Sequence, residues 1–340
     1  AGAMIARPTR SDTTTSSAPS SALTGITRVW RRPTRARAAC GATRPTNPIT
    51  PTAATAPAVR STARLSSASR VAAALLAGAA LAVAGAVVQA VSRNPLAEPG
   101  VLGVVSGAGV GAVAVLTVVP LASFWLIGGS ALAGATAAAA LVFGLAARRG
   151  LEQNRLVLIG IGVQAGAGAF VSLLIVLTDP YNETKALAWL GGSTYGRTFP
   201  ELIPVLVGLV VALPALALMR RELDLIGLDD ETPALLGVRI GATRLALLSL
   251  AVLLTAGAVA AVGVIGFVGL VAPHAARALV GRRHTRVIPV SALLGALLVV
   301  VSDLVGRAII APAQIPVGLL TAVIGAPYFI WLLWRSRREG

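Results

Sequence analysis

The chain has 340 residues, of which 56% are hydrophobic and 12% are charged, and its formal net charge is +16. A soluble domain carries about 25% charged residues, so this composition excludes an ordinary soluble protein and favours closely packed membrane helices. The single cysteine, Cys40, excludes an internal disulfide or a cysteine metal cluster, and the two histidines, His274 and His284, are too few to predict a metal site.

The segment 1–69 differs from the rest of the chain. It is rich in Arg, Ser, Thr and Pro and contains no long apolar run. This composition is typical of a disordered basic tail, and it does not fit a signal peptide, which needs an apolar core before a cleavage site. We therefore expect a disordered tail over 1–69 and a membrane domain over 70–340.

From Val71 onward, apolar segments recur, each close to the length of about 20 residues that crosses a bilayer. The predicted spans are 71–91, 101–118, 121–147, 156–178, 202–219, 244–260, 262–276, 288–307 and 316–334. They predict an all-α polytopic membrane protein with about nine transmembrane helices. Two spans, 101–118 and 262–276, are short, which is tolerated where a helix packs against protein or lines a cavity.

Arginines gather in the loops on one side of these spans. They occur near 148–155, 220–244 and 277–286 and at the C-terminus. Short loops with positive charge stay in the cytoplasm, so the C-terminus is expected there, and alternation over nine spans places the tail outside. Because the charges fall between apolar segments, we expect membrane lipid, and no nucleic acid, as their partner.

The stretch "SRNPLAEPGVLGVVSGAGVGA" (92–112) interrupts two apolar segments. Its prolines predict an elbow, and Gly103, Gly107 and Gly111 follow at a spacing of four. Small residues at this spacing share one helix face and allow another helix to approach closely. The abundance of glycine, 36 residues in the chain, explains the same spacing without any packing role.

Polar side chains inside predicted spans are costly and therefore point to function. The set is Gln89, Gln164, His274, Asp303 and Arg307. Asp303 and Arg307 are four residues apart on one helix and can form an ion pair, which is the simpler explanation for both.

The chain contains no P-loop motif, so any ATP-driven step requires a partner subunit. The longest cytoplasmic loop, 220–243, mixes arginines with acids, and Asp229 or Asp230 is predicted to cap a short helix that reaches about Val238. An amphipathic helix on this face would dock a soluble subunit. A solvated connector fits the composition equally well.

Four longer motifs occur in a recognisable order. They are "NPLAEPGVLGVVSGAGVGA" from Asn94, "ETPALLGVRIGATR" from Glu231, "GVIGFVGLVAPHAARALVG" from Gly263 and "SDLVGRAIIAPAQIPVGLLTAVIGAPYFIWLL" from Ser302. Together they resemble the FecCD-type permeases, the membrane subunits of ABC importers for iron–siderophores, haem and vitamin B12. The resemblance covers about 70–340.

The resemblance implies an importer in the bacterial cytoplasmic membrane. It implies two permease subunits, identical or paralogous, together with two ATPase subunits and an extracytoplasmic substrate-binding protein. ATP and Mg would bind the ATPases, so this chain is expected to hold no cofactor or metal and to have no catalytic residue. The expected substrate is an iron(III)–siderophore, with haem or vitamin B12 as alternatives.

The resemblance also assigns roles to particular positions. The cytoplasmic gate falls on Asn94, Leu96, Glu152 and Gln153. Coupling to the ATPase falls on Asp229, Asp230, Glu231, Leu235, Leu236, Gly237 and Arg239. Docking of the binding protein falls on Arg70 and Arg307, which in the family pair with acids of that protein.

The chain departs from the family before Arg70. Family members carry ten helices, and here the stretch "RLSSASR" (64–70) is preceded by no span. Ser67 stands where the family has an arginine, and Gln314 stands at a commonly acidic position. A truncation, a wrong start site or an altered reading frame over 1–69 would each explain the missing span.

Two rival function classes make different predictions. An ion-coupled secondary transporter would use Asp303 or His274 as its coupling site and would need no ATPase. An intramembrane enzyme would need paired carboxylates or a histidine metal site inside the spans, and the sequence shows neither pattern.

Overall fold

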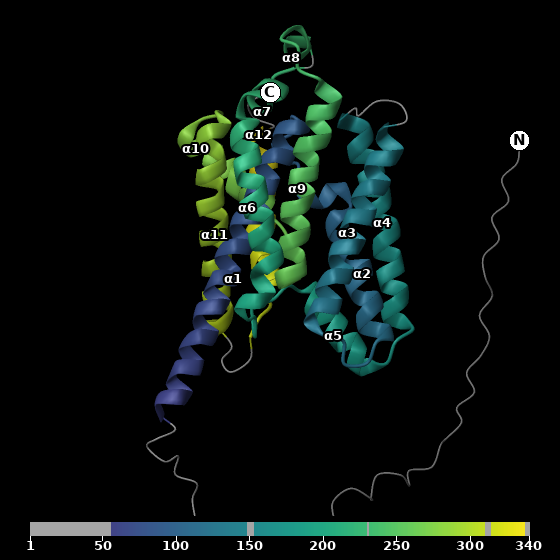
Figure 1. The fold of residues 1–340 in the computed structure, drawn as a ribbon, viewed down its shortest axis with the longest axis vertical. Helices are drawn as coiled ribbons and strands as arrows, with labels where there is room; N and C mark the ends of the chain where they lie inside the picture. Colours follow the sequence, from purple (N-terminus) through teal and green to yellow (C-terminus); the bar gives the residue numbers. More distant parts are fainter. Residues whose placement is uncertain (1–55, 148–152, 230, 310–313, 337–340) are drawn as a thin grey trace, which may run out of the picture. The chain divides into compact units, whose positions relative to one another are not determined.

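The structure, a computed structural model, describes residues 56–147, 153–229, 231–309 and 314–336 (Figure 1). Within them the long helices are α1 (Ala56–Val91), α2 (Val104–Val118), α3 (Phe124–Ala147), α4 (Gln153–Val176), α6 (Ile203–Leu218), α9 (Ile240–Val262), α10 (Val268–Val280), α11 (His284–Ile309) and α12 (Val317–Ser336). Shorter elements are η1 (Pro99–Leu102), α5 (Pro180–Leu190), η2 (Phe199–Leu202), α7 (Arg220–Ile226) and α8 (Glu231–Leu235). This part of the chain contains no strand.

Each predicted span corresponds to one long helix, which confirms the all-α polytopic architecture. Six helices are long and apolar enough to cross a membrane, and three shorter apolar helices lie in α2, α10 and α12 among the described residues. The predicted shortness of 101–118 and 262–276 is also confirmed. The 3₁₀ turn η1 occupies the start of the first, and the non-helical stretch 263–267 occupies the start of the second.

Two boundaries differ from the sequence-based expectation. Helix α1 begins at Ala56, so the expected boundary between tail and membrane domain at residue 69 falls inside a helix. Residues 1–55 lie outside the described part of the chain. The loop expected after the fourth span contains α5, whose first turn is capped by the Asp179 carboxylate and begins with Pro180. An Asp cap followed by Pro is a helix start signal, but eleven residues are too few for a span.

Helices α1 and α9 form the centre of the fold. In each, 72% of the most apolar window is buried, against 6% in α4. Their buried positions are largely alanine, including Ala73, Ala77, Ala80 and Ala84 of α1, so neighbouring helices approach closely. Helix α1 packs against α9, α10 and α11, and α9 also packs against α6 and α3. Helix α4 packs beside α2 and α3 and leaves most of its surface open (Figure 1).

The glycines of α2 serve the close packing that their spacing predicts. A Cβ atom at Gly107 would overlap the carbonyl oxygen of Gly134, and one at Gly111 would overlap that of Ser130. Helices α2 and α3 therefore cross with their backbones in contact. The third glycine, Gly103, has a different role, because it starts α2 with a left-handed φ of 73°.

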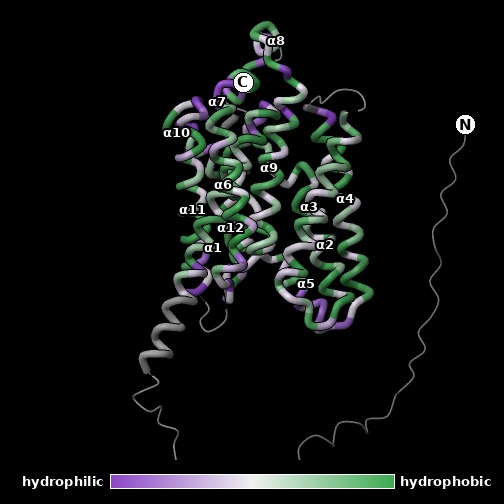
Figure 2. Tube along the Cα trace, viewed as in Figure 1, coloured by the Kyte–Doolittle hydropathy of each residue, from purple (hydrophilic) through white to green (hydrophobic). Residues whose placement is uncertain are grey.

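The helices are apolar along their lengths, and hydrophilic residues concentrate at the two ends of the bundle (Figure 2). One end carries α7, α8 and the C-terminal ends of α1 and α10 (Figure 1). The arginines that predicted the cytoplasmic side lie at this end, among them Arg221 of α7, Arg239 just before α9 and Arg282 just after α10. We call this end the α7–α8 end and the opposite one the α5 end.

Candidate functional site

The elbow between α1 and η1 is held by two local features and one long-range contact. Arg93 adopts a left-handed φ of 47°, which turns the chain out of α1. The Asn94 side chain accepts the backbone N–H of Leu96 at 2.9 Å, closing a small turn. The Glu98 carboxylate accepts the backbone N–H of Phe267 at 2.7 Å, at the start of α10. The elbow, residues 92–98, is therefore tied to a helix far away in the sequence.

The elbow is also tied to α7. The Arg93 side chain donates from Nε to the carbonyl oxygen of Ile226, the last residue of α7, at 3.0 Å. Burial lowers the pKa of Arg93 from its ordinary value; the positive charge of Arg244 lowers it further, and the negative charge of Asp229 opposes this. Arg93 thus joins the predicted gate segment to the predicted coupling loop.

The loop 220–243 folds into two short helices with well-defined ends. Before α8, Asp229 accepts the backbone N–H of Thr232 at 2.6 Å and its hydroxyl at 2.8 Å, which lowers the pKa of Asp229. After α8, Gly237 has a left-handed φ of 79°. Its N–H and that of Val238 return to carbonyls of the helix, in the arrangement that commonly ends helices at glycine.

These contacts confirm the predicted Asp229 cap and correct the length of the helix. Helix α8 ends at Leu235 instead of continuing to about Val238, because Gly237 reverses the chain. Two apolar side chains at the end of α8 are exposed: Leu235 is 87% exposed and Leu236 is 55% exposed. Exposed leucines in a polar loop are typical of a surface that another protein covers.

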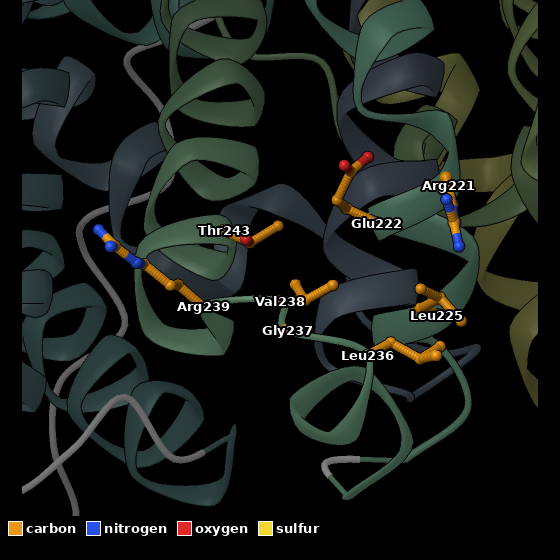
Figure 3. A pocket seen from close by; sticks show the side chains of 8 residues that line it. All are labelled: Arg221, Glu222, Leu225, Leu236, Gly237, Val238, Arg239 and Thr243. Carbon is orange, nitrogen blue, oxygen red and sulfur yellow. The ribbon is translucent and has the colours of Figure 1, made fainter.

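A cavity of about 360 Å³ lies between α7, the end of α8 and the start of α9 (Figure 3). Its walls are formed by Arg221, Glu222, Leu225, Leu236, Gly237, Val238, Arg239 and Thr243. Leucines form one side of it, and Arg221 and Arg239 extend away in different directions (Figure 3). We call the exposed leucines and this cavity together the coupling surface.

A buried ion-pair cluster lies at the α5 end. Asp303, 2% exposed, accepts hydrogen bonds from Nε and Nη2 of Arg70 at 2.9 and 2.7 Å and from the hydroxyl of Thr194 at 2.5 Å. Arg307 pairs with the other carboxylate oxygen at 3.3 Å, as its spacing predicts. Arg70 also donates to Gln314 at 2.7 Å. Two arginines therefore share one carboxylate, so the cluster keeps a net positive charge.

The other polar residues predicted inside spans do not join this cluster. Gln89 is buried between α1 and α10, where its amide donates to the carbonyl oxygen of Gly269 at 3.3 Å and its oxygen accepts from Arg277. The ring of His274 lies edge-on to Tyr328, and Gln164 is exposed on α4. The described residues contain no group of three or more His, Cys, Asp or Glu side chains that could hold a metal ion.

Some predicted site residues fall outside this description. Glu152 and Asp230 are not among the described residues, and neither is the side chain of Gln153. Sequence reasoning in turn missed two contributors, Arg93 and Thr194. Their partners are 133 and 109 residues away, and periodicity carries no signal for such pairings.

The chain matches the FecCD transport family over residues 45–335. The chain belongs to this family. The match begins inside the segment 1–69 that composition sets apart as a tail, and it includes the elbow, the coupling surface and the ion-pair cluster.

Relatives of this FecCD protein are permeases of import systems. It is 40% identical over 272 residues to the iron(3+)-hydroxamate import system permease protein FhuG of Bacillus subtilis, covering 77% of this chain and 80% of the relative. It is 42% identical over 264 residues to the Fe(3+) dicitrate transport system permease protein FecD of Escherichia coli, covering 78% and 82%. It is 38% identical over 275 residues to the hemin transport system permease protein HmuU of Yersinia pestis, covering 79% and 82%.

A solved structure shares the fold. It is described as an inward-facing conformation of a metal-chelate type ABC transporter, and it matches with a TM-score of 0.76 and 32% identity over 82% of this chain and 89% of its own. This FecCD protein is therefore a transport permease subunit of the ABC importer class and not an enzyme. Membership also disfavours the ion-coupled alternative, as does the engagement of Asp303 by two arginines.

Proposed function

We propose that this chain is the permease subunit of a binding-protein-dependent ABC importer that carries an iron(III)–siderophore by ATP-driven alternating access. Relatives named for iron(3+)-hydroxamate and Fe(3+) dicitrate support this substrate class, and a hemin relative keeps haem as the alternative. The observation that carries the mechanism is the hydrogen bond from Arg93 to Ile226, which connects the coupling loop to the gate elbow.

The coupling surface is the proposed docking site of the ATPase. Leu235 and Leu236 supply apolar contact area, and Glu231 and Arg239 lie exposed beside them. The Asp229 cap and Gly237 fix the shape of this loop before a partner binds, which reduces the entropy lost on docking. Since the pKa of Asp229 is lowered, its cap is complete at neutral pH and is lost only as the pH falls through that lowered value.

The L235D substitution (Leu235→Asp) is expected to weaken retention of the ATPase subunit by about tenfold or more. Burying a leucine contributes about 1.5–3 kcal/mol, and each 1.4 kcal/mol is about tenfold in affinity. The side chain is 87% exposed, so the fold itself should survive. The measurement is the ratio of ATPase to permease after affinity purification.

Leu121 provides the matched control for this experiment. It is 89% exposed on the loop between α2 and α3 at the α5 end, away from the coupling surface. The L121D substitution (Leu121→Asp) should leave the ratio of the two subunits unchanged. Equal loss of ATPase from both variants, or from neither, would contradict the assignment of the coupling surface.

The elbow is the proposed cytoplasmic gate. Asn94 and Leu96 lie on it, and Gln153, the first residue of α4, and Glu152 before it in the sequence are the other proposed gate positions. A displacement of α7 by the ATPase would be passed through Ile226 to Arg93 at the first residues of the elbow. Glu98 would carry the same movement to the start of α10 through Phe267.

The ion-pair cluster is proposed to anchor the binding protein. The side chain of Arg307 is 35% exposed, whereas that of Arg70 is 10% exposed and enclosed by Asp303 and Gln314. Arg307 is therefore the direct contact for an acid of the binding protein, and Arg70 positions it by sharing Asp303. Tyr195 shields this arrangement, since the Arg70 guanidinium lies 5.6 Å from its ring centre.

The R307E substitution (Arg307→Glu) should weaken binding-protein affinity several-fold, chiefly through a slower association rate. Exposed charge pairs contribute about 0.2–1 kcal/mol each, and reversing a charge replaces attraction by repulsion. Binding to proteoliposomes, measured at two salt concentrations, tests this. The R286E substitution (Arg286→Glu), at an exposed position of the α7–α8 end, is the control. Unchanged affinity in R307E would mean that Arg307 serves only the internal pair with Asp303.

A second permease copy is proposed to cover α4. This helix is apolar, yet only 6% of its window is buried within one chain. Its exposed face carries Gly162, Gly166 and Gly168 beside Gln164, which allows a neighbouring helix to pack closely. We also propose that the α7–α8 end and the C-terminus face the cytoplasm, which the positive charge of the arginine-bearing loops supports.

Purification from native membranes in mild detergent, followed by mass spectrometry, tests the proposed class. We expect an ATPase subunit with a P-loop motif to co-purify with the wild-type chain and to be depleted in L235D. A preparation that transports iron(III)–hydroxamate, iron(III)–citrate or hemin without any such subunit would overturn the proposal.

A further inference from the structure

A second cavity, of about 390 Å³, opens at the α7–α8 end between the ends of α1 and α10, the start of α11 and the turn after α7. Its lining includes Gln89, Arg93, Asp224, Arg277, Arg282 and His284. Apart from Arg93, the proposed transport cycle assigns no role to these side chains. We call this space the arginine cavity.

The charge of the arginine cavity is strongly positive. Three arginines line it, and the lining contains a single carboxylate, that of Asp224. This carboxylate is already engaged, because it accepts the backbone N–H of His284 at 2.9 Å and contacts His284 Nδ1 at 2.6 Å. Arg277 and Arg282 line the same cavity, and like charges repel each other. An anion placed between them would relieve that repulsion.

A hydrogen bond to the side-chain oxygen of Gln89 holds the guanidinium of Arg277 in position. The Gln89 amide nitrogen donates to the carbonyl oxygens of Gly269 and Leu270 at 3.3 and 3.4 Å, which leaves its oxygen to accept from Arg277. This bond uses one of the five N–H donors of a guanidinium. Gln89, a polar residue that is costly to bury in a membrane helix, thereby gains a role as the positioning residue of the cavity.

The size and depth of the cavity define the ligand. Gln89 is two residues from the end of α1, and Arg277 is three residues from the end of α10, which corresponds to about 3–5 Å inside the helix ends. Basic pockets between the ends of membrane helices bind the head groups of anionic lipids, and arginine binds phosphate oxygens in pairs. A volume of 390 Å³ is much larger than a single carboxylate needs.

We propose that the arginine cavity binds a phosphate group, carried either by an anionic phospholipid or by a soluble phosphate ester. The bound group would lie among residues of α10, of α7 with its following turn, and of the elbow. It would therefore join the elbow to α10 and α7 and stiffen the gate. That consequence rests on the proposed function, whereas the binding itself does not.

Native mass spectrometry of the full chain, purified with whatever subunits accompany it, tests the lipid source. The probe is phosphatidylglycerol, with phosphatidylcholine as the uncharged comparison. Wild type should retain phosphatidylglycerol in preference, and R282Q (Arg282→Gln) and R277Q (Arg277→Gln) should retain about tenfold less. R283Q (Arg283→Gln) is the matched control, since Arg283 is exposed, adjacent and absent from the lining. Arg282 is itself exposed, so R282Q is expected to fold even if R277Q does not.

A second arm tests the soluble source. Delipidated protein in an uncharged detergent is titrated with glycerol 3-phosphate, and thermal stability is measured. A rise in wild type and R283Q that is absent in R282Q would assign the site to a soluble phosphate ester, whereas selective lipid retention without this rise would assign it to lipid. Equal phosphatidylglycerol retention by all variants, with no effect of glycerol 3-phosphate, would overturn the proposal. Neither arm needs the ATPase or the transported substrate, so failure here is separate from failure of the importer assignment.

Discussion

The R93G substitution (Arg93→Gly) is expected to lower transport per ATP hydrolysed by about tenfold while ATP hydrolysis continues. A hydrogen bond from a charged group contributes about 1.5–3 kcal/mol, and Arg93 makes one to Ile226 at 3.0 Å. Glycine adopts the left-handed φ of 47° without strain, so the backbone of the elbow is retained and only the side chain is lost. The measurement is substrate uptake and phosphate release in the same proteoliposomes.

Two further variants separate the side chain from the backbone. R93N (Arg93→Asn) also tolerates a left-handed φ and should behave like R93G. R93K (Arg93→Lys) keeps a charged donor but loses the planar guanidinium, and it should retain part of the coupling. If R93G transports normally per ATP hydrolysed, the contact with Ile226 does not transmit movement between the coupling loop and the elbow.

The second large effect is expected at the crossing of α2 and α3. The G134A substitution (Gly134→Ala) places a methyl group against the backbone oxygen of Gly107, where the two helices are in contact. Overpacking of this kind costs about 1–3 kcal/mol, so the purified protein should unfold at a temperature several degrees lower. Thermal unfolding in detergent, followed by size-exclusion chromatography, provides the measurement.

The same helix offers the control. Gly144 lies nearer the C-terminal end of α3 than Gly134, and a Cβ atom there meets nothing within 4 Å. G144A (Gly144→Ala) should therefore leave stability unchanged or raise it slightly through better helix propensity. A G134A protein as stable as G144A would mean that α2 and α3 separate at little cost. The close crossing of these helices would then not contribute to the stability of the protein.

Local patterns in the sequence predicted much of this fold. Apolar segments near the bilayer length located every long helix, and the spacing of Gly107 and Gly111 predicted a close helix contact. The Asp229 cap and the pairing of Asp303 with Arg307 could also be predicted from the sequence, because donor and acceptor lie three or four residues apart. These features depend on neighbours along the chain, which periodicity describes directly.

The remaining features depend on contacts between distant segments. Arg70 and Asp303 are 233 residues apart, so the sequence paired Asp303 with Arg307 alone, whereas both arginines bind it. The link from Arg93 to α7 and the enclosure of Gln89 behind Arg277 arise in the same way, from helices brought together by packing. Family resemblance assigned roles to residues at the two ends of the bundle, but it contained no information on these bonds.

The direct test of the importer assignment is uptake by proteoliposomes that hold the purified full complex and its binding protein. ATP or a non-hydrolysable analogue is enclosed on the side that faces the loop 220–243, and radiolabelled iron(III)–hydroxamate, iron(III)–citrate or hemin is added on the other side. We predict uptake of one of these chelates with ATP, none with the analogue, and little with ATP in the L235D complex. Uptake that continues with the analogue and stops on addition of a proton ionophore would contradict ATP-driven transport by this chain.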